Sequence, residues 1–212
     1  MKKGAEASLF LEEWHGRRVI MKRRLEKKYR LSELDAAIRS QRTLKEPQLI
    51  HRAKEAGVPT PTIFLVDTTD ANIVMEYIDG KQVKRVLDGL SSAERLQLCR
   101  HIGAMIGRLH RQGIIHGDLT TSNMILTSLG KVFFVDFGLG ERSTELEVKG
   151  VDLHLMKRAL QSTHYRYADE CFEAVLECYS ETVGAGVAKT VLEKIREIER
   201  RGRYVSKRGI EQ

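Results

Sequence analysis

The sequence is poor in cysteine and has no long apolar run, and both absences narrow what the protein can be. Its 212 residues include three cysteines, none of them in a CxxC pair. Such a set argues against a disulfide framework and against a metal site built from cysteines, so we expect reduced, buried thiols in a cytoplasmic protein. The longest apolar runs span about six to eight residues, whereas a membrane helix needs roughly 20, so no membrane segment is expected. The N-terminal stretch MKKGAEASLFLEEW also lacks the apolar core of a signal peptide.

Prolines are equally scarce, and two of the three mark the end of a predicted helix. Apolar residues recur at helical spacing over residues 32–56, and VPTPT then forces an extended path. Alternating apolar residues and turn signals predict four strands around this helix, at residues 8–13, 17–23, 62–67 and 72–78. A turn at His15–Gly16 would join the first two strands.

Helical patterns dominate the rest of the chain. Residues 91–112 predict a helix capped by Ser91 or Ser92, with Glu94 following the cap. Further along, the pattern predicts two short strands, at residues 124–127 and 131–137. The rest of the chain is predicted to be mostly helical, with one break at residues 183–187. The sequence therefore indicates an α+β chain whose two parts meet near Asp79–Gly80.

The formal charge of +7 is unevenly distributed along the chain. Residues 17–30 are dense in lysine and arginine, and so is the C-terminal stretch ERRGRYVSKRG. One interpretation is a solvated basic surface. The other is a site for an anionic partner, such as nucleic acid or the phosphates of a nucleotide, and the sequence leaves both open.

The stretch IIHGDLTTSNMIL, residues 114–126, holds the densest group of side chains capable of chemistry. Asp118 and Asn123 stand five residues apart in it, and Asp136 follows thirteen residues later in VFFVDFGLG. All three lie at the ends of short apolar runs, where loops emerge from a rigid scaffold. Mg²⁺ prefers oxygen ligands that it shares with substrate phosphates, so Asn123 and Asp136 could hold the ion. Asp118 could then orient a hydroxyl or water for attack on a γ-phosphate.

These motifs, in this order and at these separations, resemble the catalytic loop and the metal loop of protein kinases. The resemblance implies a reduced bilobal fold, with a small β-rich N-terminal lobe at residues 1–79 and a helical C-terminal lobe at residues 80–212. It also implies ATP and Mg²⁺ as cofactors. Lys22, which ends the alternating run VIMK, would hold the α- and β-phosphates.

An acidic partner for Lys22 is expected on the helix that follows, where Glu33 and Glu46 are the candidates. We favour Glu46, in QRTLKEPQL. A rival interpretation is that Glu46 caps a helix, because Thr43 and Glu46 have the capping-box spacing. Pro47 supports this rival interpretation, since a proline kinks a helix or stands at its start.

Other parts of the nucleotide site follow from the kinase resemblance alone. The stretch KKGAEAS replaces the usual G-x-G-x-x-G loop, and Gly4 and the small Ala5 still leave backbone N–H groups open to a phosphate. VMEYIDG resembles the linker between the lobes of a kinase. Met75 would then lie at the back of the adenine site, with the Glu76 carbonyl and the Ile78 N–H on the adenine edge.

A further absence follows the DFG motif. An ordinary protein kinase has a long activation segment ending in A-P-E, whereas this chain passes from DFG to a helix carrying Asp152 in about fourteen residues. The arginine that usually pairs with a phosphorylated activation loop is replaced by Gly117. Regulation by that route is excluded, and a broad peptide-binding platform is not expected.

The chain as a whole resembles the small kinase subunit of the KEOPS (EKC) complex, the PRPK-like atypical serine/threonine kinases. The likeness rests on KKGAEAS, YRLSELDAAIRSQRTLKE, HRAKEAGVPTP, HGDLTTSNMIL, DFGLG and VDLHLMKRALQSTH. Glu46–Pro47 departs from the expected Glu-Ala.

This resemblance implies a kinase that autophosphorylates when alone. Beside its partner, the threonylcarbamoyl-transferase subunit, and the other KEOPS subunits, it would act mainly as an ATPase in making threonylcarbamoyladenosine in tRNA. The basic tail would face the partner or tRNA through Arg200, Arg201, Arg203, Lys207 and Arg208.

Two alternatives stand beside this interpretation. A RIO-like atypical kinase acting in ribosome assembly would also lack the A-P-E segment, but its metal loop usually reads D-x-G where Phe137 stands here. A non-catalytic pseudokinase scaffold would not need to retain the lysine, the two aspartates and the asparagine described above.

Overall fold

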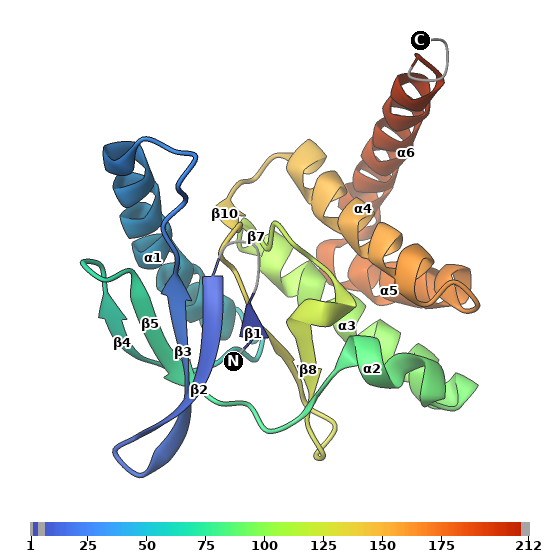
Figure 1. Cartoon of the computed structure of the whole chain (residues 1–212). Coiled ribbons are helices and arrows are strands. Elements are labelled where there is room, and N and C mark those ends of the chain that lie inside the picture. The colour runs from blue at the N-terminus through green and yellow to red at the C-terminus, as the bar shows by residue number, and fades with distance from the viewer. Residues whose placement is uncertain (1, 4–6, 209–212) are drawn as a thin grey trace.

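A computed structural model describes residues 2–3 and 7–208, and it shows a β-rich N-terminal region joined to a helical C-terminal region (Figure 1). The expected α+β class is therefore confirmed. The N-terminal region combines helix α1 with a five-stranded antiparallel sheet in the order β1-β2-β3-β5-β4. The strands are β1 (Lys2–Lys3), β2 (Ala7–Trp14), β3 (Arg17–Arg24), β4 (Ile63–Asp67) and β5 (Asn72–Glu76).

The β2–β3 hairpin holds Lys22 in a rigid position. His15 and Gly16 have φ angles of 50° and 72°, which are the positive values of the tight turn that matches the twist of paired strands. The expected turn is confirmed. Strand β3 then pairs with β2 on one side and with β5 on the other, so Lys22 lies opposite both Leu9 and Ile73.

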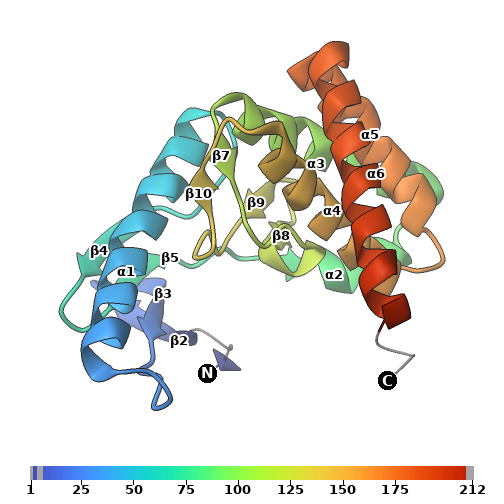
Figure 2. The ribbon, with the colours of Figure 1, turned by 90° about the horizontal axis from the view of Figure 1, so that it is seen from above.

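Helix α1 (Ser32–Glu55) packs against β4 and β5 and runs through Pro47 as one helix (Figure 2). Thr43 lies inside it, and its hydroxyl donates a hydrogen bond to the Arg39 carbonyl (2.7 Å). The rival interpretation, in which Thr43 and Glu46 start a helix, is therefore wrong. A proline inside a helix removes one backbone hydrogen bond and costs about 3 kcal/mol, so other contacts must hold this turn.

The C-terminal region follows a linker at residues 77–80. Its helix α3 begins at the expected capping box, in which the Ser91 hydroxyl accepts from the Glu94 N–H while the Glu94 carboxylate accepts from the Ser91 N–H. The elements are β6 (Lys81–Gln82), α2 (Val83–Val86), η1 (Leu87–Gly89), α3 (Ser92–Arg111), β7 (Ile114–Ile115), η2 (Thr121–Asn123), β8 (Met124–Leu126), β9 (Val132–Phe134), β10 (Glu141–Arg142), α4 (Leu146–Thr163), α5 (Ala168–Val183) and α6 (Ala185–Arg208). None of the helices in the described part of the chain is both long and apolar enough to cross a membrane.

The main apolar core lies in the C-terminal region, and half of α1 belongs to it. Leu49, Ile50 and Ala53 of α1 are buried in the same cluster as apolar residues of α3, α4 and α5. Within this core α3 and α5 approach closely at Gly103, where an added Cβ would lie 2.0 Å from the Val175 carbonyl oxygen. The loops that follow β7 and β9 thus rest on a densely packed base.

We predict that Gly103→Ala destabilises the protein by about 2–3 kcal/mol, because the methyl group must push α3 away from the backbone of α5. The free energy of unfolding in urea measures the loss. Gly186→Ala is the matched control, since an added Cβ there meets nothing within 4 Å, and it should leave stability unchanged or slightly raised. Equal stability of the two variants would contradict the close approach.

Candidate active site

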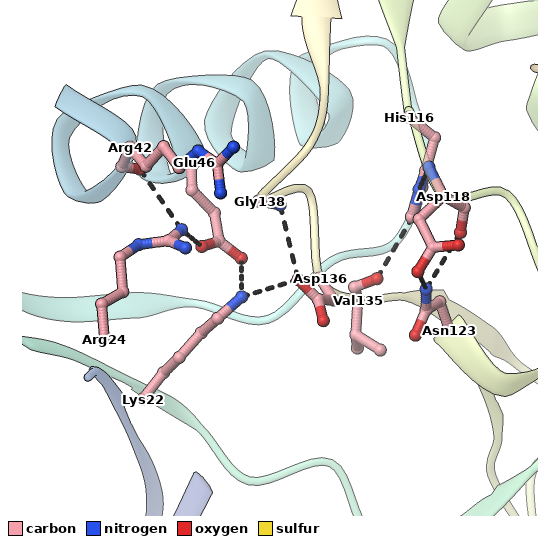
Figure 3. A network of polar contacts seen from close by, with 10 residues as sticks. All are labelled: Lys22, Arg24, Arg42, Glu46, His116, Asp118, Asn123, Val135, Asp136 and Gly138. Carbon is pink, nitrogen blue, oxygen red and sulfur yellow. Dashed lines mark hydrogen bonds and ion pairs between the residues drawn. The ribbon is translucent and has the colours of Figure 1, made fainter. Parts of the chain in front are cut away.

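Lys22 lies at the centre of a buried ionic cluster. Its side chain is almost inaccessible, and its Nζ is 2.7 Å from Glu46 Oε1 and 2.6 Å from Asp136 Oδ1 (Figure 3). Of the two glutamates considered as its partner, Glu46 faces it, whereas Glu33 is exposed in the first turn of α1. Burial alone would lower the pKa of Lys22, but the two carboxylates outweigh it and hold this pKa above its ordinary value. The ammonium group is therefore charged at neutral pH.

A second cation, which the sequence analysis did not single out, shares the same carboxylate. Arg24 Nη2 lies 2.5 Å from Glu46 Oε2 and 3.4 Å from the Arg42 carbonyl oxygen, and the side chain is 4% exposed. Residues 22 and 24 of a strand point to the same face, so strand periodicity was the available signal. It was hidden among the many basic residues of this segment.

Asp118 and Asn123 lie together in the loop between β7 and β8. The Asn123 amide nitrogen donates to Asp118 Oδ2 (2.8 Å) and to the Asp118 carbonyl oxygen (2.9 Å). The Asp118 N–H in turn donates to His116 Nδ1 (3.3 Å). These bonds fix the Asp118 carboxylate in one orientation at the surface of the loop (Figure 3).

The His116 ring is a neutral imidazole that holds this loop through hydrogen bonds. Its Nε2 lies 3.2 Å from the Val135 carbonyl oxygen, which can only accept, so Nε2 carries the proton and Nδ1 accepts from Asp118. Burial lowers the pKa of His116, although nearby carboxylates oppose the shift. Its ring also packs against Phe137 with centroids 4.5 Å apart, and this joins the loop to the DFG motif.

Asp152 of α4 holds the backbone of the same loop. Its carboxylate accepts from the N–H of His116 (2.9 Å), from the N–H of Gly117 (3.0 Å) and from His110 Nε2 (3.2 Å). Burial alone would raise the pKa of Asp152, but the hydrogen bonds from the His110 ring and from the His116 backbone hold it below its ordinary value. The sequence pattern predicts a helix at Asp152 but indicates no role for this residue. Its signal was an acidic residue on the apolar face of a predicted helix.

Gly117 stands where no side chain fits. Its φ is 78°, and an added Cβ would lie 2.2 Å from the Leu139 carbonyl oxygen. The segment after DFG is bound at this point, because β10 pairs with β7 in antiparallel register and α4 begins at Leu146. The backbone of residues 139–142 thus lies against the loop at Gly117 and leaves no room for a side chain there.

The other expected nucleotide-site residues lie along the strand that leads to the linker or outside the described part. Met75 and Ile78 are each 7% exposed, at and after the end of β5. Glu76 donates its backbone N–H to a carbonyl next to β4 (2.8 Å). Gly4 and Ala5, expected to approach a phosphate, lie outside the described residues.

The donor set near Asp136 suits Mg²⁺ that is shared with phosphates. The Asp136 side chain is half exposed, and the charge of Lys22 overcomes the effect of burial and lowers its pKa, so the carboxylate is ionised. The Asn123 nitrogen is used by Asp118, which leaves the amide oxygen for a cation. In the described part of the chain, no cluster of three or more acidic, histidine or cysteine side chains could enclose a metal alone. Mg²⁺ commonly completes its shell with water and phosphate oxygens.

Comparison with known proteins agrees with this geometry. A model of the protein kinase domain matches residues 3–174. The KEOPS complex subunit Bud32 of Pyrococcus abyssi is 49% identical over 100% of this chain and 99% of its own length. This chain belongs to the Bud32 family of protein kinases. The family expected from the sequence is confirmed, and it is favoured over the RIO-like alternative.

Longer relatives contain a similar kinase unit. The probable bifunctional tRNA threonylcarbamoyladenosine biosynthesis protein of Methanothermobacter thermautotrophicus is 48% identical over 96% of this chain. The chain spans 36% of that relative's length. Among solved structures, the ADP/Mg²⁺-phosphoaspartate complex of the Rio2 kinase from Chaetomium thermophilum has a TM-score of 0.64 at 17% identity, covering 94% of this chain and 70% of that one. The likeness to Rio2 shows the protein-kinase fold.

We predict that Asp152→Asn lowers the free energy of unfolding at pH 7 by about 2–4 kcal/mol, because an amide replaces a buried anion that accepts three hydrogen bonds. Since the pKa of Asp152 is depressed in the folded state, its stabilisation is present above the unfolded carboxyl pKa and is lost as the pH falls through the folded value. The gap between wild type and variant should therefore shrink below about pH 4. Urea unfolding from pH 7 to pH 3 measures it.

Asp70→Asn is the control, because Asp70 is exposed in the turn between β4 and β5. It should change stability by less than about 0.5 kcal/mol at every pH. A gap for Asp152→Asn that stays constant down to pH 3 would contradict the role given to its ionised carboxylate.

Proposed function

We propose that this kinase uses MgATP and that transfer of the γ-phosphoryl group to water is its main reaction in a KEOPS-type complex. The proposal rests on two pairs of side chains, Lys22 with Asp136 and Asp118 with Asn123, on a scaffold with a short segment after DFG. The Val135 N–H, next to Asp136, donates to the Asn123 carbonyl (3.0 Å) and so connects the two pairs. Water as the acceptor needs no peptide groove. As a serine/threonine kinase, the isolated chain would also phosphorylate itself.

Each side chain has a role that its contacts support. Lys22, charged and held by Glu46, would bind the α- and β-phosphates. Asp136 and Asn123 would hold Mg²⁺, which when bound neutralises phosphate charge. Asp118, oriented by Asn123 and His116, would accept a hydrogen bond from the attacking water or hydroxyl and direct it in line with the leaving group.

Met75, Glu76 and Ile78 would form the adenine side of the site. The backbone groups of the linker would bind the base edge, and Met75 would provide an apolar surface behind it. Gly4 and Ala5 would cover the phosphates. In this proposal residues 1–79 and 80–212 are the two lobes of one kinase domain.

The names of the relatives support the cellular context. One is a KEOPS complex subunit, and others are bifunctional proteins of tRNA threonylcarbamoyladenosine biosynthesis in which a kinase-like unit is about a third of the chain. When two activities are joined in one polypeptide in some relatives, the corresponding separate chains are expected to associate in others. We infer that the partner of this chain is the threonylcarbamoyl-transferase subunit.

The basic tail remains a proposed contact with that partner or with tRNA. Arg200 is exposed in the C-terminal half of α6, whereas Arg201 forms ion pairs with Glu147 (2.9 Å) and Glu197 (3.6 Å). The side chains of Arg203 and the later basic residues lie outside the described part.

We predict that Asp118→Ala reduces ATP turnover at least about 100-fold while MgATP binding is largely preserved, because Asp118 orients the nucleophile rather than the nucleotide. Asp136→Ala should instead abolish the Mg²⁺-dependent part of binding. Turnover and calorimetric titration with and without Mg²⁺ distinguish the two. Asp70→Ala is the control and should match wild type in both measurements. An active Asp118→Ala variant would refute the role assigned to Asp118.

The test of the function follows free phosphate and labelled protein together, for the pure chain with and without the transferase subunit. We expect phosphate release to rise and self-labelling to fall when the partner is added. Labelling of a third protein that does not change when the partner is added would instead indicate an ordinary protein kinase. Nucleotide binding without either product would favour a scaffold.

A further inference from the structure

The two halves of α1 are held by different forces. Its C-terminal half contributes Leu49, Ile50 and Ala53 to the main apolar core. The buried residues of its N-terminal half and centre are instead polar, namely Asp35, Thr43 and Glu46. Of these three, Glu46 is the one whose side chain meets the sheet, through Lys22 and Arg24 of β3.

The boundary between the two halves is a weak point of the backbone. Pro47 follows Glu46 directly, and a proline has no N–H to donate to the carbonyl of residue 43 one turn before. The residue preceding a proline is also disfavoured in helical conformation. Glu46 is helical nevertheless, so contacts of its side chain must help to fix this turn.

Two cations from β3 meet the two oxygens of that side chain. Lys22 takes Oε1 and Arg24 takes Oε2, and all three groups are more than nine-tenths buried. Lys22 divides its ammonium group between Glu46 and Asp136, whereas Arg24 also reaches the backbone of α1 at the Arg42 carbonyl. A nucleotide phosphate would compete for Lys22 but leave the Arg24–Glu46 pair intact.

Arg24 also lies close to the DFG segment. An added Cβ at Gly138 would lie 3.2 Å from Arg24 Nη2 and 3.4 Å from Lys22 Nζ. One guanidinium nitrogen of Arg24 thus joins β3 to α1 and lies beside the loop after Asp136. The buried Nε of the same side chain has no hydrogen-bond partner in the described part of the chain, so Nη2 carries the contacts that orient the group.

We propose that Arg24 is a positioning residue, which locks the N-terminal half of α1 against the sheet and keeps Glu46 on Lys22 before nucleotide binds. Ordinary kinases control the same lysine–glutamate pair through the position of the helix and a phosphorylated activation loop. This chain has a short strand in place of that loop, so an internal arginine supplies the lock permanently. The catalytic side of this inference rests on the proposed function, whereas the helix lock does not.

The first experiment compares Arg24→Met, Arg24→Lys and Arg23→Met in the full chain. Arg23 is the adjacent residue on the opposite face of β3, is exposed and bonds to Asn72, so Arg23→Met removes the same charge outside the cluster. Amide hydrogen exchange of α1 is measured at a temperature at which all variants are folded. For Arg24→Met we expect protection to fall at least about tenfold over residues 36–46 and to stay unchanged over residues 49–55, which the apolar core holds.

Arg24→Lys retains a cation that can reach Glu46 and should keep most of the protection, and Arg23→Met should keep all of it. Equal loss in both halves of α1, or no loss in either half, would overturn the lock. If Arg24→Met does not fold, graded loss of protection in Arg24→Lys over residues 36–46 alone provides the same test. The exchange measurement contains no nucleotide, so it remains informative even if the chain proves unable to turn over ATP.

A double-mutant cycle with Glu46→Gln shows whether Arg24 acts through Glu46. We expect Arg24→Met to lower kcat/KM for MgATP at least about tenfold, since only the fraction of molecules with the helix in place is competent. The double variant Arg24→Met/Glu46→Gln should be no worse than Glu46→Gln alone. Effects that multiply would mean that Arg24 contacts the nucleotide itself, which would overturn the positioning role. Arg23→Met should have the kcat and KM of wild type.

Discussion

Lys22 can be charged inside the protein because two carboxylates from distant parts of the chain meet it there. A buried cation without such partners would lose its proton or be forced into water, since transfer of an ion out of water is costly. Glu46 arrives from α1 and Asp136 from the DFG loop, so one ammonium group ties together a strand, a helix and a loop. Lys22 meets both carboxylates when the sheet, the helix and the loop are arranged as they are here. The remaining parts of the site are built around this cluster.

A second buried carboxylate, that of Asp152, holds the loop that carries Asp118 in place. Asp152 accepts two consecutive backbone N–H groups, and it thereby sets the direction in which Asp118 leaves the loop. His116 then connects the two networks, because its backbone binds Asp152 while its ring binds the backbone beside Asp136. The candidate active site is therefore positioned by buried charge, whereas the apolar core of α3 and α5 provides the fixed base.

Local sequence patterns were sufficient for much of this description and insufficient for the rest. The alternation in VIMK placed Lys22 on a strand, the Ser91–Glu94 spacing gave a helix start, and the loop motifs with their spacing indicated kinase chemistry. Pro47 was harder, because its local preference for a break is overridden by tertiary contacts of the neighbouring Glu46. Arg24 and Asp152 depend on partners more than 20 residues away, so no short window could assign them. Gly117 was noted for the arginine it replaces, but the carbonyl that excludes any side chain there becomes visible only in the folded chain.

The short strand after DFG has a consequence for inhibitor chemistry. Phe137 is 1% exposed within the main core, its ring packs on His116, and the following residues are bound as β10 to β7. Compounds that select a kinase by displacing this phenylalanine would have to break that strand pairing and open the core at the same time. Selective ligands for this enzyme should instead leave this arrangement intact, for example by directing an acidic group to Lys22, whose ammonium group is shared between Glu46 and Asp136.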